Sequence, residues 1–129
     1  MLARLSLILF LASPAAALDR YAPPGSTQDG YASWYGPGFH GRKTACGAIP
    51  GHTSLYNEWR MTAAHKTLRC GVSVQVTRHG YPPVILTITD RGPYIKGRII
   101  DVSRAAAKTL GLLKSGVGRV TIRVLGKDE

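Results

Sequence analysis

Acidic side chains are scarce in this sequence, which has seven Asp and Glu among its 129 residues. Four of these acids lie close to the ends of the chain, where solvated side chains hold no fixed geometry: Asp19, Asp29, Asp128 and Glu129. Glu58, Asp90 and Asp101 remain as candidates for acid–base chemistry. A carboxyl group held partly out of water keeps its proton more readily, and a general acid needs that property.

Asp90 has the most informative position of the three. It follows the apolar stretch Val84–Thr89 and precedes Arg91, Gly92 and Pro93. We therefore expect its carboxylate at the mouth of a strand, on a rigid element that faces a cleft. Two interpretations are open: the carboxylate is a general acid, or it organises the turn by accepting bonds from the backbone N–H groups that follow. Asp101 is a weaker candidate, since it lies near Ser103 and can serve a helix N-terminus.

His65 lies in "MTAAHKTL", among small and apolar residues, where a lone histidine is either structural or functional. The other histidines show no metal-ligand spacing, so we predict no metal and no cofactor. Phosphate loops, dinucleotide fingerprints and nucleophile elbows are absent from the sequence. Several aromatic side chains could stack on sugar rings, although aromatic residues in a small domain usually belong to the core.

The charge of the chain favours an anionic partner. Seventeen Lys and Arg against seven Asp and Glu give a net charge of +10. Nucleic acid is not the predicted partner, because the sequence has neither a binding motif nor a long basic helix. An anionic cell-wall polymer or membrane surface fits better. The simpler alternative is that the charge only keeps the protein soluble.

Residues 1–17 have the layout of a secretory signal peptide, with an early cation, a short apolar stretch and small residues before the cleavage point. The apolar stretch is too short to span a membrane, and no cysteine follows that would carry a lipid. We therefore predict a soluble, secreted, periplasmic protein. In that oxidising compartment Cys46 and Cys70 should pair, closing a loop of 24 residues worth about 3 kcal/mol; two buried free thiols are the alternative.

After the signal peptide we predict a linker over residues 18–29, one domain over 30–126 and a tail over 127–129. The domain reads as mainly β. Alternating or apolar stretches predict four strands: Tyr31–Gly36, Val72–Thr77, Val84–Thr89 and Arg119–Leu125. One short helix is expected between Ser103 as N-cap and Gly111 as stop. Short strands with one helix favour a closed barrel over an open sheet.

Four separated stretches closely resemble the rare lipoprotein A (RlpA) family of double-psi β-barrel proteins: "ASWYGPGFHGRKTACG", "TAAHKTL", "DRGPYIKGRIIDVSRAAAKTLG" and "GVGRVTIRVL". The resemblance covers residues 31–125. It implies a six-stranded double-psi β-barrel with one short α-helix. It also implies lytic transglycosylase activity, in which the β-1,4 bond after N-acetylmuramic acid (MurNAc) is cut and a 1,6-anhydro end is left.

The family's aspartate falls on Asp90 and its histidine on His65, which the resemblance implies are catalytic. The sequence departs from the family at Ala48, where members have a glutamate, and Glu58 is the possible substitute. One carboxyl group can suffice for this chemistry. A transglycosylase uses the sugar's own 6-hydroxyl as nucleophile, so one group can act first as acid and then as base. Typical members also carry a lipidated cysteine and a glycan-binding C-terminal domain, and neither is found in this sequence.

The leading hypothesis is therefore a monomeric peptidoglycan lytic transglycosylase acting on glycan strands. Six residues are predicted to bind substrate: Trp34, Tyr35, Arg91, Tyr94, Lys96 and Arg98. The cations among them would hold the lactyl carboxylates of the glycan. The alternative is a non-catalytic, expansin-like module that binds cell-wall polysaccharide through aromatic and basic side chains, and the absence of the glutamate at position 48 favours it.

Overall fold

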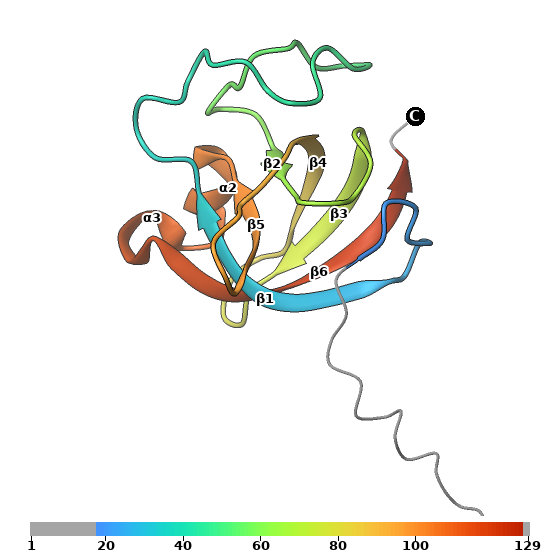
Figure 1. Cartoon of the computed structure of the whole chain (residues 1–129). Helices are drawn as coiled ribbons and strands as arrows, with labels where there is room; N and C mark the ends of the chain where they lie inside the picture. The colour runs from blue at the N-terminus through green and yellow to red at the C-terminus, as the bar shows by residue number, and fades with distance from the viewer. Residues whose placement is uncertain (1–17, 128–129) are drawn as a thin grey trace, which may run out of the picture.

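The computed structural model describes residues 18–127, so the predicted signal peptide lies outside the described residues. Six strands form one closed barrel in the order β1-β5-β2-β4-β3-β6 (Figure 1). Their bounds are β1 Thr27–Trp34, β2 Thr62–Ala64, β3 Val72–Thr77, β4 Val84–Asp90, β5 Arg98–Val102 and β6 Val117–Lys127. The pairs β1–β5 and β2–β4 are parallel, and the other neighbours are antiparallel. The predicted mainly β, six-stranded barrel is confirmed.

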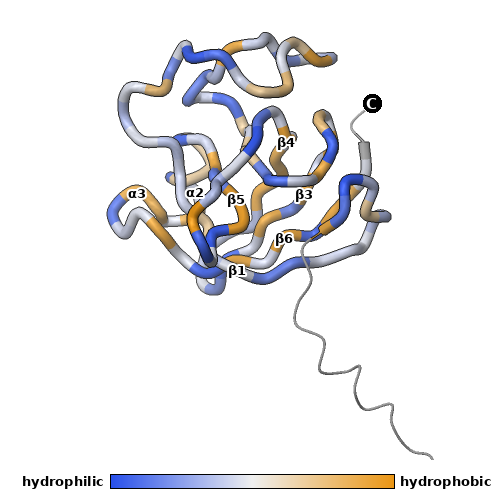
Figure 2. The backbone as a smooth tube through the Cα atoms, viewed as in Figure 1, coloured by the Kyte–Doolittle hydropathy of each residue, from blue (hydrophilic) through white to orange (hydrophobic). Residues whose placement is uncertain are grey.

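The barrel core follows from alternation along β3 and from the apolar positions of β4. In β3, Val72, Val74 and Val76 are buried, while the residues between them are partly exposed. Leu86 and Ile88 of β4 are fully buried. Successive strand side chains point to opposite faces, so these apolar positions meet inside the barrel. Figure 2 shows the hydrophobic segments along the strands.

Two short helices, α2 (Arg104–Thr109) and α3 (Leu112–Ser115), pack beside the barrel, where one helix was expected. Ser103 is the N-cap, as predicted, and its Oγ accepts a bond from the N–H of Ala106. Gly111 ends the first helix with a φ of 69°, a left-handed conformation that suits glycine. The chain then forms a second helical turn, in which Leu112 is fully buried in the core.

The segment predicted as a linker takes part in the barrel. The first strand begins at Thr27, before the expected domain start at Gly30. Leu18 and Ala22 pack into the main core, and the N–H of Gly25 donates to the carbonyl of Val124. Burial of these two side chains and the hydrogen bond to β6 explain why this segment packs on the barrel despite its prolines and glycine.

A long connection, residues 35–61, runs over one end of the barrel, and we call it the covering loop (Figure 1). Its regular pairing is limited to two isolated bridges, Lys43 with Leu55 and Ile49 with His52. The disulfide between Cys46 and Cys70 ties it to the barrel, with an S–S distance of 2.02 Å, and confirms the predicted pairing. Among residues 18–127, no helix is both long and apolar enough to cross a membrane.

Candidate active site

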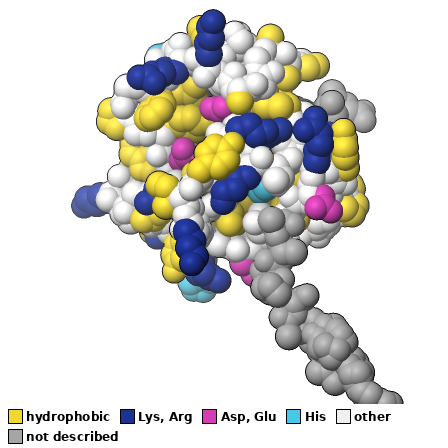
Figure 3. Space-filling view, viewed as in Figure 1, with side chains coloured by type: hydrophobic (Ala, Val, Ile, Leu, Met, Phe, Trp, Pro, Cys, Tyr) yellow, Lys and Arg dark blue, Asp and Glu magenta, His cyan; other side chains and the backbone are white. Residues whose placement is uncertain are grey.

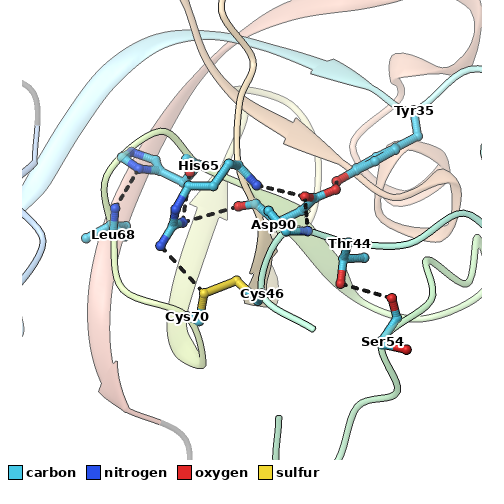
Figure 4. The surroundings of a disulfide bond; sticks show 10 residues. Tyr35, Thr44, Cys46, Ser54, His65, Leu68, Cys70 and Asp90 are labelled. Carbon is cyan, nitrogen blue, oxygen red and sulfur yellow. Dashed lines mark hydrogen bonds between the residues drawn. A yellow bond between two sulfur atoms is a disulfide. The ribbon is translucent and has the colours of Figure 1, made fainter. Parts of the chain in front are cut away.

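Three donors converge on the carboxylate of Asp90 at the end of β4 (Figure 4). Its Oδ1 accepts the N–H of Ala45 at 2.7 Å and the N–H of Arg91 at 2.9 Å. Its Oδ2 accepts the hydroxyl of Tyr35 at 2.8 Å. Hydrogen bonds of this kind are stronger when the accepting carboxylate is ionised. Asp90 therefore organises the turn, through Arg91, and also faces the covering loop, so the two sequence interpretations are compatible.

A cavity of about 240 Å³ lies against this carboxylate, and Asp101 is a second acid in its wall. The strand register explains why two acids meet. Ala64 of β2 pairs with Asp90 on β4 and with Asp101 on β5. Laterally paired residues point to the same face of a sheet, so both carboxylates enter one cavity. The sequence pointed only weakly to Asp101, because the register that places it beside Asp90 depends on barrel closure.

The pKa of the Asp101 carboxyl is raised to about 6, chiefly by burial and further by the charge of Asp90. Two neighbours act in the opposite direction. The hydroxyl of Ser33 donates to Oδ1 of Asp101 at 3.2 Å, and the cation Arg98 lies on the same strand. Burial outweighs both, because it penalises the charged form of a carboxyl. Asp101 is thus a carboxyl group that holds its proton in mildly acidic solution.

Aromatic side chains form another wall of the cavity. The Tyr35 ring stacks on Tyr56 with a centroid distance of 4.2 Å and meets Phe39 edge-on at 5.9 Å. Burial, followed by the charge of Asp90, raises the pKa of the Tyr35 hydroxyl above its ordinary value, so the hydroxyl stays protonated and donates. The Tyr56 hydroxyl accepts the N–H of Arg104 at the start of α2. This stack fixes the donor that Asp90 uses.

His65 is buried, at 2 % exposed, and its ring points away from the Asp90 carboxylate (Figure 4). Nδ1 accepts the N–H groups of Thr67 and Leu68, both at 3.1 Å. With Nδ1 an acceptor, Nε2 carries the hydrogen and donates to Oε1 of Gln28 at 2.9 Å. Burial, followed by the charges of Arg91 and Lys66, lowers the pKa of the imidazole to about 4. The ring is therefore neutral at pH 7 and stabilises the turn that follows β2 by hydrogen bonds.

The backbone of His65 does reach Asp90. Its N–H donates to the Asp90 carbonyl at 3.2 Å. Arg91 strengthens the same junction, because its Nη1 donates to the carbonyls of His65 and Asp90, at 3.1 and 3.3 Å. Its Nη2 lies 3.5 Å from Sγ of Cys70 (Figure 4). Arg91 lines the cavity, but its guanidinium is bonded to β2, β4 and the disulfide and links these three parts.

Arg42 and Lys43 of the covering loop supply the other cations of the cavity wall. Sequence reasoning missed them, although both lie in the quoted stretch 32–47 that carries the family resemblance. Figure 3 shows one face of the molecule, where few acidic side chains lie among hydrophobic and basic ones. A cavity with aromatic walls and cationic neighbours suits a sugar polymer that carries carboxylates.

The remaining predicted residues lie outside this cavity. The Trp34 side chain packs against the barrel core. Tyr94 is 75 % exposed, Lys96 is exposed, and Arg98 is partly buried on β5. Glu58 lies near the start of α2, where its carboxylate is 4.0 Å from Nε of Arg104 and 3.9 Å from Nδ1 of His40. Glu58 therefore does not join Asp90, because the covering loop carries it to the helix end.

The barrel belongs to the double-psi class, and solved structures of that class are similar to it. One is a Streptomyces papain inhibitor, which is 25 % identical and has a TM-score of 0.61. The match covers 80 % of this chain and 97 % of the inhibitor. Another is an expansin from Clavibacter michiganensis, which is 23 % identical and has a TM-score of 0.58. That match covers 77 % of this chain and 50 % of the expansin. The expansin likeness concerns the fold alone.

The family model described as lytic transglycolase matches residues 27–122, and the chain belongs to this family. Relatives named endolytic peptidoglycan transglycosylase RlpA are similar in sequence. The protein from Pasteurella multocida is 50 % identical over 81 % of this chain and 34 % of its own length. That from Campylobacter jejuni is 44 % identical over 79 % of this chain and 35 % of its own. The chain thus spans about a third of the length of these relatives.

Proposed function

We propose that this domain is a peptidoglycan lytic transglycosylase. It cleaves the β-1,4 bond between MurNAc and N-acetylglucosamine and leaves a 1,6-anhydro-MurNAc end. The observation that carries this proposal is the Asp90 carboxylate, held by three donors in a cavity with aromatic and basic walls. The names of the similar proteins, endolytic peptidoglycan transglycosylases, support the same reaction.

Asp90 acts in general acid–base catalysis. In this reaction the 6-hydroxyl of the MurNAc residue attacks its own C1, so the nucleophile is already in place and water is not consumed. The carboxylate of Asp90 accepts the proton of that hydroxyl. The Tyr35 hydroxyl and the N–H of Ala45 hold the carboxylate in position, since hydrogen bonds at 2.7–2.8 Å restrict its rotation.

His65 is a positioning residue in this scheme. Its ring holds the turn that follows β2, and its N–H holds the Asp90 carbonyl. Substrate binding is proposed for the rings of Tyr35 and Phe39, with Arg42 and Lys43 attracting the lactyl carboxylates. Tyr94 and Lys96, in the exposed loop after Asp90, are proposed to contact further sugars of the glycan chain.

We also propose that the protein works in the periplasm and is exported by the segment 1–17. The disulfide between Cys46 and Cys70 supports an oxidising compartment. Peptidoglycan, the proposed substrate, lies in the same compartment. A test is to fuse residues 1–30 to a reporter that is active only after export, beside a fusion that lacks the first 17 residues.

The direct test is to incubate the chain, disulfide intact, with peptide-free and with intact peptidoglycan and to analyse soluble fragments by mass spectrometry. Asp90→Asn should reduce the rate of anhydro-ended products by about 10²–10⁴-fold, because the proton acceptor is lost. Asp19→Asn is the matched control, since Asp19 is exposed and distant in the chain. Co-sedimentation of the wild type with glycan without any fragments would replace this proposal with the expansin-like binding module.

A further inference from the structure

We propose that Asp101 is a second catalytic carboxyl group and that it protonates the glycosidic oxygen, while Asp90 accepts the proton of the 6-hydroxyl. This inference rests on the proposed function and divides its two proton transfers between two residues. It replaces the scheme in which one carboxyl group does both. Neither the family histidine nor Glu58 takes part in either transfer.

The first support is the placement of the two acids around Ala64. Asp90 and Asp101 lie on the strands at either side of β2, both paired with Ala64. Adjacent strands are about 4.8 Å apart, so the two backbone positions are separated by about 10 Å. Ala64, the residue that pairs with both, has only a methyl group as its side chain. Both residues line the same cavity, so a sugar bound there can contact both carboxyl groups.

The second support is the difference between the two surroundings. The Asp90 carboxylate accepts bonds from Ala45, Arg91 and Tyr35, an arrangement that matches an ionised group. Asp101 has one side-chain donor, the hydroxyl of Ser33. Its pKa is raised to about 6 by burial and by Asp90. Two carboxyls whose environments differ in this way are suited to opposite roles, one as acid and one as base.

The proton transfers balance without a co-reactant. Asp101 gives its proton to the glycosidic oxygen as the bond from that oxygen to C1 of MurNAc breaks. The 6-oxygen of the same MurNAc forms the new bond to C1, and its proton passes to Asp90. The products are a 1,6-anhydro end and a free 4-hydroxyl, with Asp101 ionised and Asp90 protonated. Proton exchange with solvent then restores the starting state.

Other charged and titratable groups around Asp101 set the pH at which it can act. Asp90 faces it from β4, Arg98 lies on its own strand, and Tyr35 and Tyr56 face it from the covering loop. The same cavity contains the cations Arg42, Lys43 and Arg91. The Ser33 hydroxyl favours the ionised form of Asp101. Its removal therefore raises the pKa of Asp101 further, and the activity should extend to higher pH.

The test measures the rate of anhydro-product formation from pH 4 to pH 8 for the wild type, Asp101→Asn and Ser33→Ala. We expect the wild-type rate to fall as the pH rises through about 6, where Asp101 loses its proton. Asp101→Asn should lose about 10²–10⁴-fold of the rate across the range, because an amide cannot supply the proton. Ser33→Ala should stay active and shift the alkaline limb to higher pH.

Ser33→Ala keeps the test decisive if Asp101→Asn folds poorly. If Asp101 had only a structural role, Ser33→Ala would leave the alkaline limb of the pH profile unchanged. Circular dichroism and thermal unfolding at each pH identify loss of fold. Full activity in folded Asp101→Asn, or an unmoved alkaline limb in Ser33→Ala, would overturn the assignment of Asp101. A wild type without anhydro products would instead overturn the proposed function, and the two failures are thereby distinguished.

Discussion

The N–H of Ala45 donates a 2.7 Å hydrogen bond to Oδ1 of Asp90, across 45 residues of sequence. The next residue is Cys46, whose disulfide to Cys70 anchors the loop, and its own N–H donates to the Thr89 carbonyl. The covalent link therefore acts on the position of a donor to the proposed catalytic carboxylate, as well as on stability.

Loss of the disulfide should reduce both stability and activity. Cys46→Ser with Cys70→Ser removes a cross-link over 24 residues, which corresponds to about 3 kcal/mol of unfolding free energy. The rate of anhydro-product formation should fall as well, at temperatures where the variant is still folded, because the Ala45 donor is less fixed. Thermal unfolding and product assays with and without reductant test this. The double variant is the control, since reductant should change only the wild type.

Tyr35→Phe should separate the contribution of the Tyr35 hydrogen bond to activity from that of the ring stack. The substitution removes the donor to Oδ2 of Asp90 and keeps the contact with Tyr56. A hydrogen bond to a charged group contributes about 1.5–3 kcal/mol, so the rate should fall by about 10- to 100-fold. Tyr31→Phe, at an exposed position on β1, is the control. An unchanged rate in Tyr35→Phe would show that the hydroxyl does not position Asp90.

His65→Gln should lower the free energy of unfolding at pH 7 by about 1–3 kcal/mol, because the N–H groups of Thr67 and Leu68 lose their acceptor. The imidazole pKa is lowered in the folded protein, from 6.5 to about 4. Its stabilisation is therefore complete above pH 6.5 and is lost as the pH falls toward 4.

Denaturant unfolding of both proteins from pH 4 to pH 8 measures this dependence. The stability difference between the wild type and His65→Gln should shrink as the pH falls through this window. Asp101, whose pKa is raised from 3.8 to about 6, has the opposite effect, since its contribution is lost as the pH rises from 4 to 6. Asp101 is present in both proteins, so its effect cancels in the difference. A difference that stays constant with pH would contradict the buried neutral state of His65.

Gly111→Ala should be strongly destabilising, by about 2–4 kcal/mol, since two effects combine. The residue has a φ of 69°, and an added Cβ would clash with the Tyr81 ring. Gly116→Ala is the matched control, because it has a φ of 78° and open space around the added carbon. Thermal unfolding should show a larger loss at position 111. Adding Tyr81→Ala should recover part of that loss, and no recovery would exclude the steric contribution.

Local sequence patterns determined much of this protein. The alternation in Val72–Thr77 and the apolar Val84–Thr89 predicted two strands, because neighbouring side chains decide which face is buried. Ser103 and Gly111 marked a helix through capping and a left-handed turn, which are also local effects. The disulfide followed from the cysteine count, and the strand end at Asp90 from Gly92 and Pro93. β2 and β5 were not predicted, as both are short.

Only the tertiary structure decided which side chains meet. Asp101 lies beside Asp90 because barrel closure sets the register of β5 and β4 on either side of Ala64. His65 turns away from Asp90 because its ring satisfies two amide groups of the following turn. Glu58 lies at the helix end because the covering loop crosses the barrel first. Registers and loop paths depend on contacts between residues far apart in the chain, and local patterns contain no information on them.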